Sequence, residues 1–184
     1  MDAPRMTYYA RIIDNLDDSQ ITGFKDTKLN SNWNYGQCDG LIGGESQYIV
    51  EFDIWNNEPA FNAGTYDVAV QNAINCKLSV LPNGSILDPT SDLAKLFNLS
   101  NPFVYARCTT FSYTETWVGI KINDNPILSQ YLEEITGNVS PLVKGTILGD
   151  ADHAIVQTKI ILPANSNIDA NRYNFNLVFY YDYQ

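Results

Sequence analysis

The sequence predicts an all-β protein, an antiparallel β-sandwich of the immunoglobulin-like or jelly-roll kind with one or two short helices. Apolar and polar residues alternate with a period of two along much of the chain, as in half-buried strands. Turn-forming Asn, Gly and Pro residues separate these runs. The chain has 184 residues, of which 45% are hydrophobic, so it is long enough to bury the core of one compact domain.

The alternating runs predict at least eight strands. Within residues 47–54, for example, Val50 and Phe52 share one face of the expected strand and Glu51 lies on the other. Residues 82–85, Pro-Asn-Gly-Ser, predict a turn, because Asn-Gly readily adopts positive φ. The expected strands are residues 7–13, 47–54, 64–70, 75–81, 102–113, 115–122, 154–162 and 172–183.

The last run, residues 172–183, is the most aromatic. One face of this strand is expected to carry Tyr173, Phe175, Leu177, Phe179, Tyr181 and Tyr183. It is the favoured strand for pairing with the sheet edge of a neighbouring molecule, where main-chain hydrogen bonds give affinity with little charge. The pattern suits a central strand of the chain's own domain equally well.

Two short helices are expected between the strands. Ser91-Asp92 can cap a helix over residues 93–98. Asn125 can cap a second helix with Pro126 at its first position, and an apolar stripe then runs to Ile135 before Gly137 ends it.

The chain is expected to divide into residues 1–46 and residues 47–184. The first part holds one strand and an irregular stretch rich in Asn, Asp, Ser and Gly, which forms either an extended arm or a long loop. Phe24, Trp33 and Tyr35 lie in this stretch, and a flexible linker rarely contains such aromatics. The second part is the sandwich domain. The residues expected to make intermolecular contacts are Trp33, Tyr35, Phe24, Trp55, Tyr181 and Tyr183.

Charge and hydropathy argue against two classes of partner. The formal net charge is −10 and the basic residues are scattered, so neither a nucleic acid nor an anionic membrane surface is an expected partner. No apolar run reaches the roughly 20 residues of a membrane helix. The first six residues lack the basic and apolar regions of a signal peptide, so the chain is expected to fold in a cytoplasm.

No residue pattern predicts catalysis, and the chain is not expected to be an enzyme. His153 is the one histidine, and it follows Asp150 and Asp152. A general base or metal ligand could be built there, but a polar loop is the favoured interpretation. The adjacent carboxylate pairs of the chain diverge on a loop or helix and form no matched pair for glycoside hydrolysis.

No cofactor is expected. Residues 14–19 carry oxygen ligands of the kind calcium prefers, but Leu16 stands at a ligand position and the EF-hand glycine is absent, so structural calcium is only an open alternative. Cys38, Cys76 and Cys108 are widely spaced and odd in number, which predicts reduced, mostly buried thiols.

One segment carries a resemblance. Residues 51–67, Glu-Phe-Asp-Ile-Trp-Asn-Asn-Glu-Pro-Ala-Phe-Asn-Ala-Gly-Thr-Tyr-Asp, and their continuation to Cys76 resemble stretches of accessory virion proteins of tailed bacteriophages, in particular the crAss-like group. The resemblance implies a small β-sandwich in the virion, made in the host bacterial cytoplasm. It implies a role in head decoration, a head fibre or a neck or tail ring. It transfers no functional residue.

Two functions are therefore expected, in order of preference. The first is a non-enzymatic virion structural protein that forms homo-oligomers and binds other virion proteins, such as the major capsid, portal or tail ring proteins. The alternative is a carbohydrate-binding or host-adhesion β-sandwich, in which Trp33, Trp55 or Trp117 would stack on sugar rings.

Overall fold

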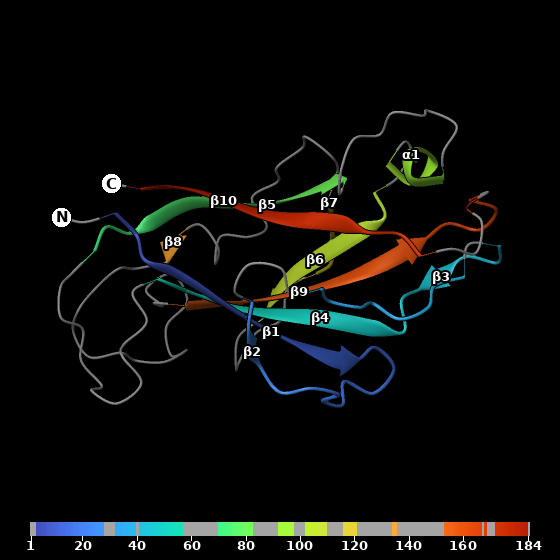
Figure 1. The fold of residues 1–184 in the computed structure, drawn as a ribbon, viewed down its shortest axis with the longest axis horizontal. Coiled ribbons are helices and arrows are strands. Elements are labelled where there is room, and N and C mark those ends of the chain that lie inside the picture. Colours follow the sequence, from blue (N-terminus) through green and yellow to red (C-terminus); the bar gives the residue numbers. More distant parts are fainter. Residues whose placement is uncertain are drawn as a thin grey trace.

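The computed structural model shows an all-β chain built from two antiparallel sheets that face each other (Figure 1). It describes residues 3–27, 32–39, 41–56, 70–82, 92–97, 102–109, 116–120, 134–135, 153–166, 168 and 172–183. The elements are β1 (Met6–Asp14), β2 (Lys25–Asp26), β3 (Gly44–Glu45), β4 (Tyr48–Asn56), β5 (Ala73–Pro82), α1 (Asp92–Phe97), β6 (Val104–Thr109), β7 (Val118–Ile120), β8 (Glu134–Ile135), β9 (His153–Leu162) and β10 (Phe175–Tyr183).

The larger sheet has the strand order β2-β1-β4-β9-β6-β7, with β3 paired to β9. Its central strands are long and in continuous register: β1 pairs with β4 from Met6↔Asn56 to Asp14↔Tyr48. The smaller sheet has the order β10-β5-β8. Figure 1 shows β5 and β10 in one layer above β1, β4 and β9. The predicted antiparallel sandwich is therefore confirmed.

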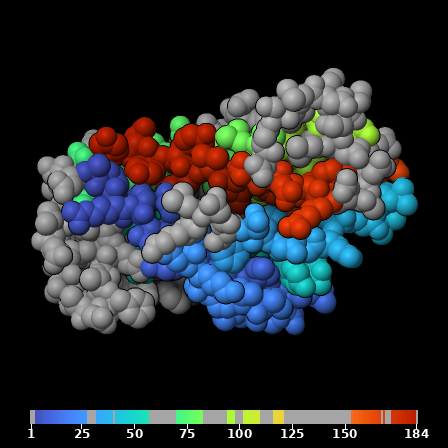
Figure 2. Space-filling model, in the orientation of Figure 1, coloured from blue at the N-terminus to red at the C-terminus, as the bar shows by residue number. Residues whose placement is uncertain are grey.

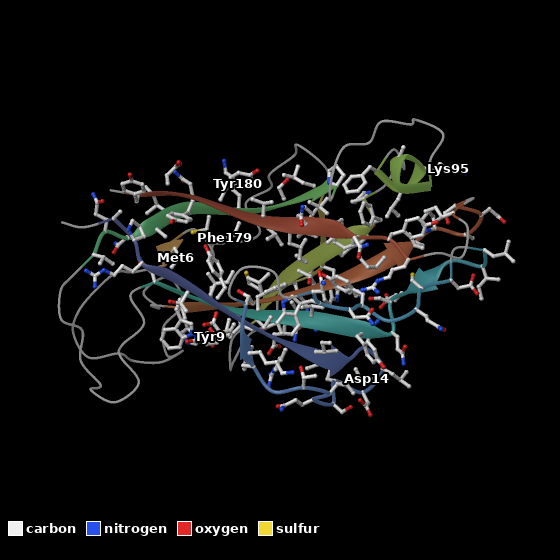
Figure 3. All side chains as sticks on the ribbon, viewed as in Figure 1. Met6, Tyr9, Asp14, Lys95, Phe179 and Tyr180 are labelled. Carbon is white, nitrogen blue, oxygen red and sulfur yellow. The ribbon has the colours of Figure 1, made fainter. Side chains whose placement is uncertain are left out.

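The core lies between the two sheets because every second side chain of each strand points inward. The smaller sheet contributes Cys76, Leu78 and Val80 of β5, and the larger sheet contributes Ile54 of β4 and Val156 of β9. The predicted aromatic face of the last strand is confirmed from Tyr173 to Tyr181, since these residues pack against this core, but Tyr183 at its end is exposed. Figure 3 shows Phe179 directed between the layers and Tyr180 directed away from them.

Asn75 introduces an irregularity where β5 pairs with β10. The register changes between Tyr180↔Lys77 and Asp182↔Ile74, so β5 contains an extra residue there. Asn75 has φ 51°, a left-handed conformation that asparagine tolerates better than most residues. Its Nδ2 donates to Oδ2 of Asp182 at 3.1 Å, which bridges the two strands at this point.

The second predicted helix is wrong in its last turn. Glu134 and Ile135 form the short strand β8, which pairs with Ile74 and Ala73 of β5. The free edge of β5 satisfies their backbone groups, and this pairing outweighs the helical apolar stripe. The rest of residues 125–137 lies outside the described residues, as do residues 64–69 and 83–85. The first predicted helix is confirmed as α1.

Candidate functional site

A cavity of about 1150 Å³ lies between the two sheets, on the side where β10 ends the smaller sheet. Its inner wall is apolar and includes Phe52 and Ile54 of β4, Leu78 of β5 and Val156 of β9. One rim consists of residues 32–39, from the irregular N-terminal stretch, and the other consists of residues 172–179. We call this cavity the β10 groove.

Both rims of the β10 groove are runs of consecutive residues. All eight residues from 32 to 39 and all eight from 172 to 179 line the groove. Along β10, successive side chains point to opposite sides, so its consecutive residues line the cavity along the backbone edge of the strand. Figure 2 shows the red atoms of β10 extending across this face of the molecule, with blue N-terminal atoms below them.

Within the described residues, the edge of β10 that faces away from β5 has no strand partner, and we call it the free edge. Among the described strands, β10 pairs with β5 alone. Phe175 lies opposite Pro82, which has no amide hydrogen, so these two residues form a non-hydrogen-bonded pair. Alternation along an antiparallel ladder then directs the N–H and C=O groups of Phe175, Leu177 and Phe179 away from β5.

Tyr35 fixes the N-terminal rim to the larger sheet. Its hydroxyl lies 2.8 Å from Oγ1 of Thr158. Because the Thr158 hydroxyl donates to the carbonyl of Val50 at 3.0 Å, the Tyr35 hydroxyl is the donor of the pair. The Tyr35 carbonyl accepts from the amide of Tyr48, and its ring stacks on Phe175 with centroids 5.8 Å apart. Burial raises the pKa of Tyr35 above the ordinary tyrosine value.

Trp33 places an unsatisfied donor at the same rim. The indole Nε1 is buried and has no hydrogen-bond partner among the described residues. Trp33 lines the β10 groove two residues before Tyr35. A buried N–H without an acceptor is costly, and such groups in native proteins usually mark a missing ligand, water or partner.

Aromatic rings join the β10 groove to the core. Phe103 packs edge-on against Phe175, with centroids 5.4 Å apart. Tyr8 of β1 packs edge-on against Phe179, with centroids 5.9 Å apart. Burial, followed by the charges of Tyr181 and Cys76, raises the pKa of Tyr8. These contacts hold the inward face of β10 against the larger sheet while its backbone edge is left free.

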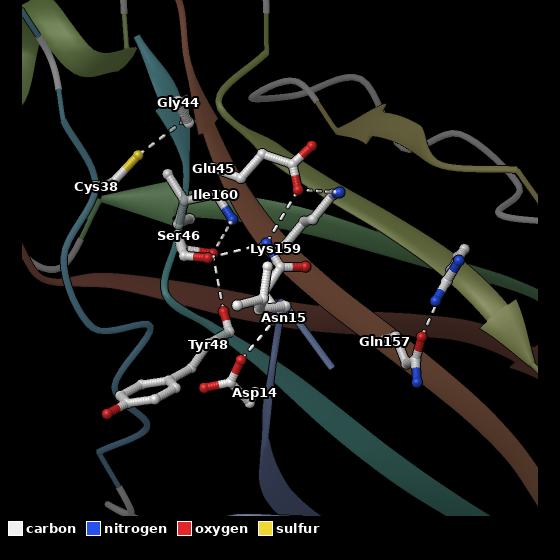
Figure 4. A network of polar contacts seen from close by, with 12 residues as sticks. Asp14, Asn15, Cys38, Gly44, Glu45, Ser46, Tyr48, Gln157, Lys159 and Ile160 are labelled. Carbon is white, nitrogen blue, oxygen red and sulfur yellow. Dashed lines mark hydrogen bonds and ion pairs between the residues drawn. The ribbon is translucent and has the colours of Figure 1, made fainter. Parts of the chain in front are cut away.

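A polar network fixes the chain between the N-terminal rim and β4 (Figure 4). Ser46 is buried, and its hydroxyl donates to the Tyr48 carbonyl at 2.8 Å and accepts from the Ile160 amide at 3.0 Å. Beside it, Lys159 forms an ion pair with Glu45 at 2.5 Å. The Glu45 carboxylate also accepts from Asn15 at 3.0 Å. The hydrogen bond from Lys159 keeps the pKa of Glu45 below its ordinary value.

The outer face of the larger sheet carries a row of polar residues in one register. Glu51 lies between Arg11 and Gln157 on neighbouring strands, and Arg107 follows on the next strand. Glu51 accepts from Arg11 Nε at 2.7 Å and from Gln157 Nε2 at 2.7 Å, and Gln157 accepts from Arg107 Nε at 2.8 Å. The row stabilises the sheet internally, because Glu51 and Gln157 are both buried.

His153 lies at the start of β9 and is buried, not in a polar loop. Its Nδ1 lies 2.6 Å from Oδ1 of Asp53, and its ring stacks on Trp55 with centroids 4.2 Å apart. The neighbouring Asp150 and Asp152 lie outside the described residues. Sequence reasoning missed Asp53 as the partner, because 100 residues separate it from His153 and only the β4–β9 pairing joins them.

The residues expected to make contacts fall in three places. Trp33 and Tyr35 meet at the β10 groove. Trp55 is only 4% exposed beneath His153, and Phe24 lies on the outer face of the larger sheet under the Arg11 guanidinium. Tyr181 packs against the core near the end of β10, and Tyr183, beyond it, is 57% exposed. The structure therefore does not gather these residues into one surface.

In the loop of residues 14–19, two carboxylates accept hydrogen bonds from backbone amides of the same loop. Oδ1 of Asp14 accepts from the Leu16 amide and Oδ1 of Asp17 accepts from the Ser19 amide, at 2.8 and 2.9 Å. In the described part of the chain, no group of three His, Cys, Asp or Glu residues could hold a metal ion. None of the three cysteines, all of which the structure describes, forms a disulfide, and Cys76 and Cys108 are buried. No described helix has the length and apolar character needed to cross a membrane.

Comparison of the chain with protein-family models, with curated proteins and with solved structures finds no match. A functional interpretation therefore depends on the chain's own residues, and chiefly on the β10 groove.

Proposed function

We propose that this chain is a non-enzymatic structural subunit of a tailed-bacteriophage virion that acts by multicopy assembly, and that the free edge of β10 is its main contact. The observation that carries the proposal is the position of β10. This strand of nine residues ends the smaller sheet, and the backbone groups of Phe175, Leu177 and Phe179 are directed away from its single described neighbour, β5.

The composition of β10 supports a contact there. Natural proteins protect edge strands with lysine, proline, bulges or short length, because an open edge pairs with other chains. The sequence of β10 contains neither lysine nor proline, and Asp182 is its one charged residue. The bulge at Asn75 is an extra residue of β5, which pairs with the opposite edge of β10. It therefore does not interrupt the free edge of β10.

Strand addition also suits the charge of the chain. Copies of the chain repel one another because each has a net charge of −10, so a contact between them must depend on something other than charge. Main-chain hydrogen bonds and buried aromatic surface provide such a contact. The resemblance of residues 51–76 to accessory virion proteins supports the wider setting, in which the partners are further copies and capsid, portal or tail ring proteins.

No specific observation favours the carbohydrate-binding alternative. Trp55 is stacked on His153 and almost fully buried. The ring of Trp117 has the Arg107 guanidinium 4.4 Å and the Lys159 ammonium 4.5 Å from its centroid. Trp33 lies at the rim of the β10 groove. These three indoles do not form one exposed platform for a sugar.

Light scattering over a tenfold concentration range tests the proposal. The wild-type chain is expected to form a discrete oligomer. Replacing Asn176 and Tyr180, both exposed on β10, by lysine should reduce it to monomer, because edge lysines oppose strand pairing. Leu16→Lys is the control, since Leu16 is 95% exposed in a distant turn. A wild-type chain that stays monomeric, or a double variant of unchanged mass, would contradict assembly through β10.

A further inference from the structure

We infer that the β10 groove binds a single extended strand from another polypeptide chain, with apolar side chains at alternate positions, inserted between β10 and residues 32–39. The inference rests on the proposed function and names the kind of contact that the free edge makes. The partner is defined by its chemistry: a peptide backbone to pair with β10, and alternating apolar side chains to fill the interior.

The rims of the groove specify a peptide backbone. The N–H and C=O groups of Phe175, Leu177 and Phe179 point toward the groove at every second residue, which is the spacing that an added β-strand matches. On the opposite rim, the carbonyls of Tyr35 and Gln37 are already bonded to the amides of Tyr48 and Gln47. The inserted strand therefore pairs with β10 and packs against residues 32–39.

The inner wall specifies the side chains. Tyr8 and Phe52 of the larger sheet and Leu177 and Phe179 of the smaller sheet line the groove, and all four pack against the core while staying only partly buried. Protein interiors are close-packed, so a space of about 1150 Å³ with such a lining is stabilised by an occupant. Alternate residues of an inserted strand point inward and fill it, while the intervening residues point outward.

Trp33 supplies an independent observation. Its buried Nε1–H has no acceptor among the described residues, although it lies on the groove rim. A backbone carbonyl of the inserted strand would accept this hydrogen bond. A purely hydrocarbon occupant would leave both the indole N–H and the β10 edge unsatisfied.

Peptide binding to the full-length protein tests the inference. The probe is a capped peptide of alternating threonine and valine, eight residues long to match residues 172–179. Its control has the same side chains but carries N-methyl groups on alternate amides, in two versions that cover both strand edges. The unmodified peptide is expected to bind, and the version methylated on the edge facing β10 is expected not to bind.

Amide hydrogen exchange provides the structural readout. Without peptide, the amides of Phe175, Leu177 and Phe179 should exchange faster than those of Asn176 and Val178, which pair with β5. The peptide should protect the first three and leave the other two unchanged. Trp33→Phe should weaken binding by about three- to tenfold through the lost N–H. Trp117→Phe, outside the groove lining, is the control and should bind normally.

Three outcomes would overturn the inference: no binding of the unmodified peptide, equal binding of both methylated versions, or the same protection pattern with dodecanoate in place of peptide. These results can be distinguished from a failure of the proposed function. If the peptide protects the β10 edge but the chain never assembles, the groove is a strand-binding site and the assembly proposal fails. If the chain assembles through β10 but the peptide does not bind, only the inserted strand is wrong.

Discussion

The hydroxyls of Tyr35 and Thr158 lie 2.8 Å apart, and this hydrogen bond joins the irregular N-terminal stretch to the centre of the larger sheet. Thr158 lies on β9, with its neighbours β4 and β6 on either side. The described part of residues 14–46 is therefore held against the sandwich, with Tyr35 as one attachment. Through its stacking on Phe175, the same ring also reaches the rim formed by β10.

Removing the Tyr35 hydroxyl should measurably destabilise the chain. Tyr35→Phe keeps the ring but loses the hydrogen bond to Thr158, at an expected cost of about 0.5–1.5 kcal/mol in the free energy of unfolding. Tyr35→Ala also removes the buried ring and should cost about 3–5 kcal/mol. Urea unfolding measures both values, and Tyr183→Phe, at an exposed position, is the control. Equal stability of Tyr35→Phe and the wild type would show that the hydroxyl contributes nothing.

Stability should fall at alkaline pH. Burial raises the folded-state pKa of Tyr35 and of Tyr8, whereas the unfolded chain ionises near pH 10. The stabilisation is complete below pH 10 and is lost as the pH rises from there toward the folded-state pKa values, because only the unfolded chain gains charge. Unfolding midpoints between pH 8 and pH 11 measure the loss. The double variant Tyr8→Phe, Tyr35→Phe should show a shallower decline, and an unchanged slope would contradict this cause.

The hydrogen bonds that the Glu51 carboxylate accepts should contribute more to the free energy of unfolding than those that the Glu45 carboxylate accepts. Glu51→Gln replaces one carboxylate oxygen by an amide donor, so a hydrogen bond to Arg11 or Gln157 is lost inside the sheet. We expect a cost of about 1–3 kcal/mol. Glu45→Gln makes the same chemical change at a side chain that is 48% exposed, and should cost less than Glu51→Gln. Guanidinium unfolding of both variants tests the order, and the reverse order would refute it.

The three thiols should differ in their accessibility. Cys38 is partly buried and donates to the Gly44 carbonyl at 3.1 Å, whereas Cys76 and Cys108 are buried in the core. Burial raises the pKa of Cys38, so a disulfide reagent should modify it slowly at pH 8, and should modify the other two only after unfolding. Cys38→Ser should abolish the native-state reaction. Modification of two or more thiols in the folded chain would contradict the burial.

Local alternation was sufficient to predict the longer described strands, but not the two-residue strands β2, β3 and β8. Seven of the predicted segments overlap β1, β4, β5, β6, β7, β9 or β10, because half-buried strands leave a period of two in the sequence. The same logic failed at Glu134–Ile135, where an apolar helical stripe and a strand on the edge of β5 compete. Local pattern cannot decide between them, since the hydrogen-bond partner lies about 60 residues away.

The candidate site was predicted only in part. Trp33 and Tyr35 stood out because aromatics are rare in an irregular stretch, and both lie on the rim of the β10 groove. Trp55 was an aromatic candidate at the end of a predicted strand, but it is buried where it pairs with His153. Aromatic residue type does not distinguish a core ring from a contact ring, because both contribute the same apolar surface.

The sequence by itself determined the all-β class, the inward face of β10 and the absence of a predicted catalytic pattern, because each depends on neighbours within a few residues. Only the tertiary structure decided that β10 is an edge among the described strands, that Asp53 meets His153 and that residues 32–39 form one side of a groove. The physical reason is that strand order and cross-strand contacts depend on hydrogen bonds between residues far apart in sequence. Alternation fixes which face of a strand is buried, but not which strand lies beside it.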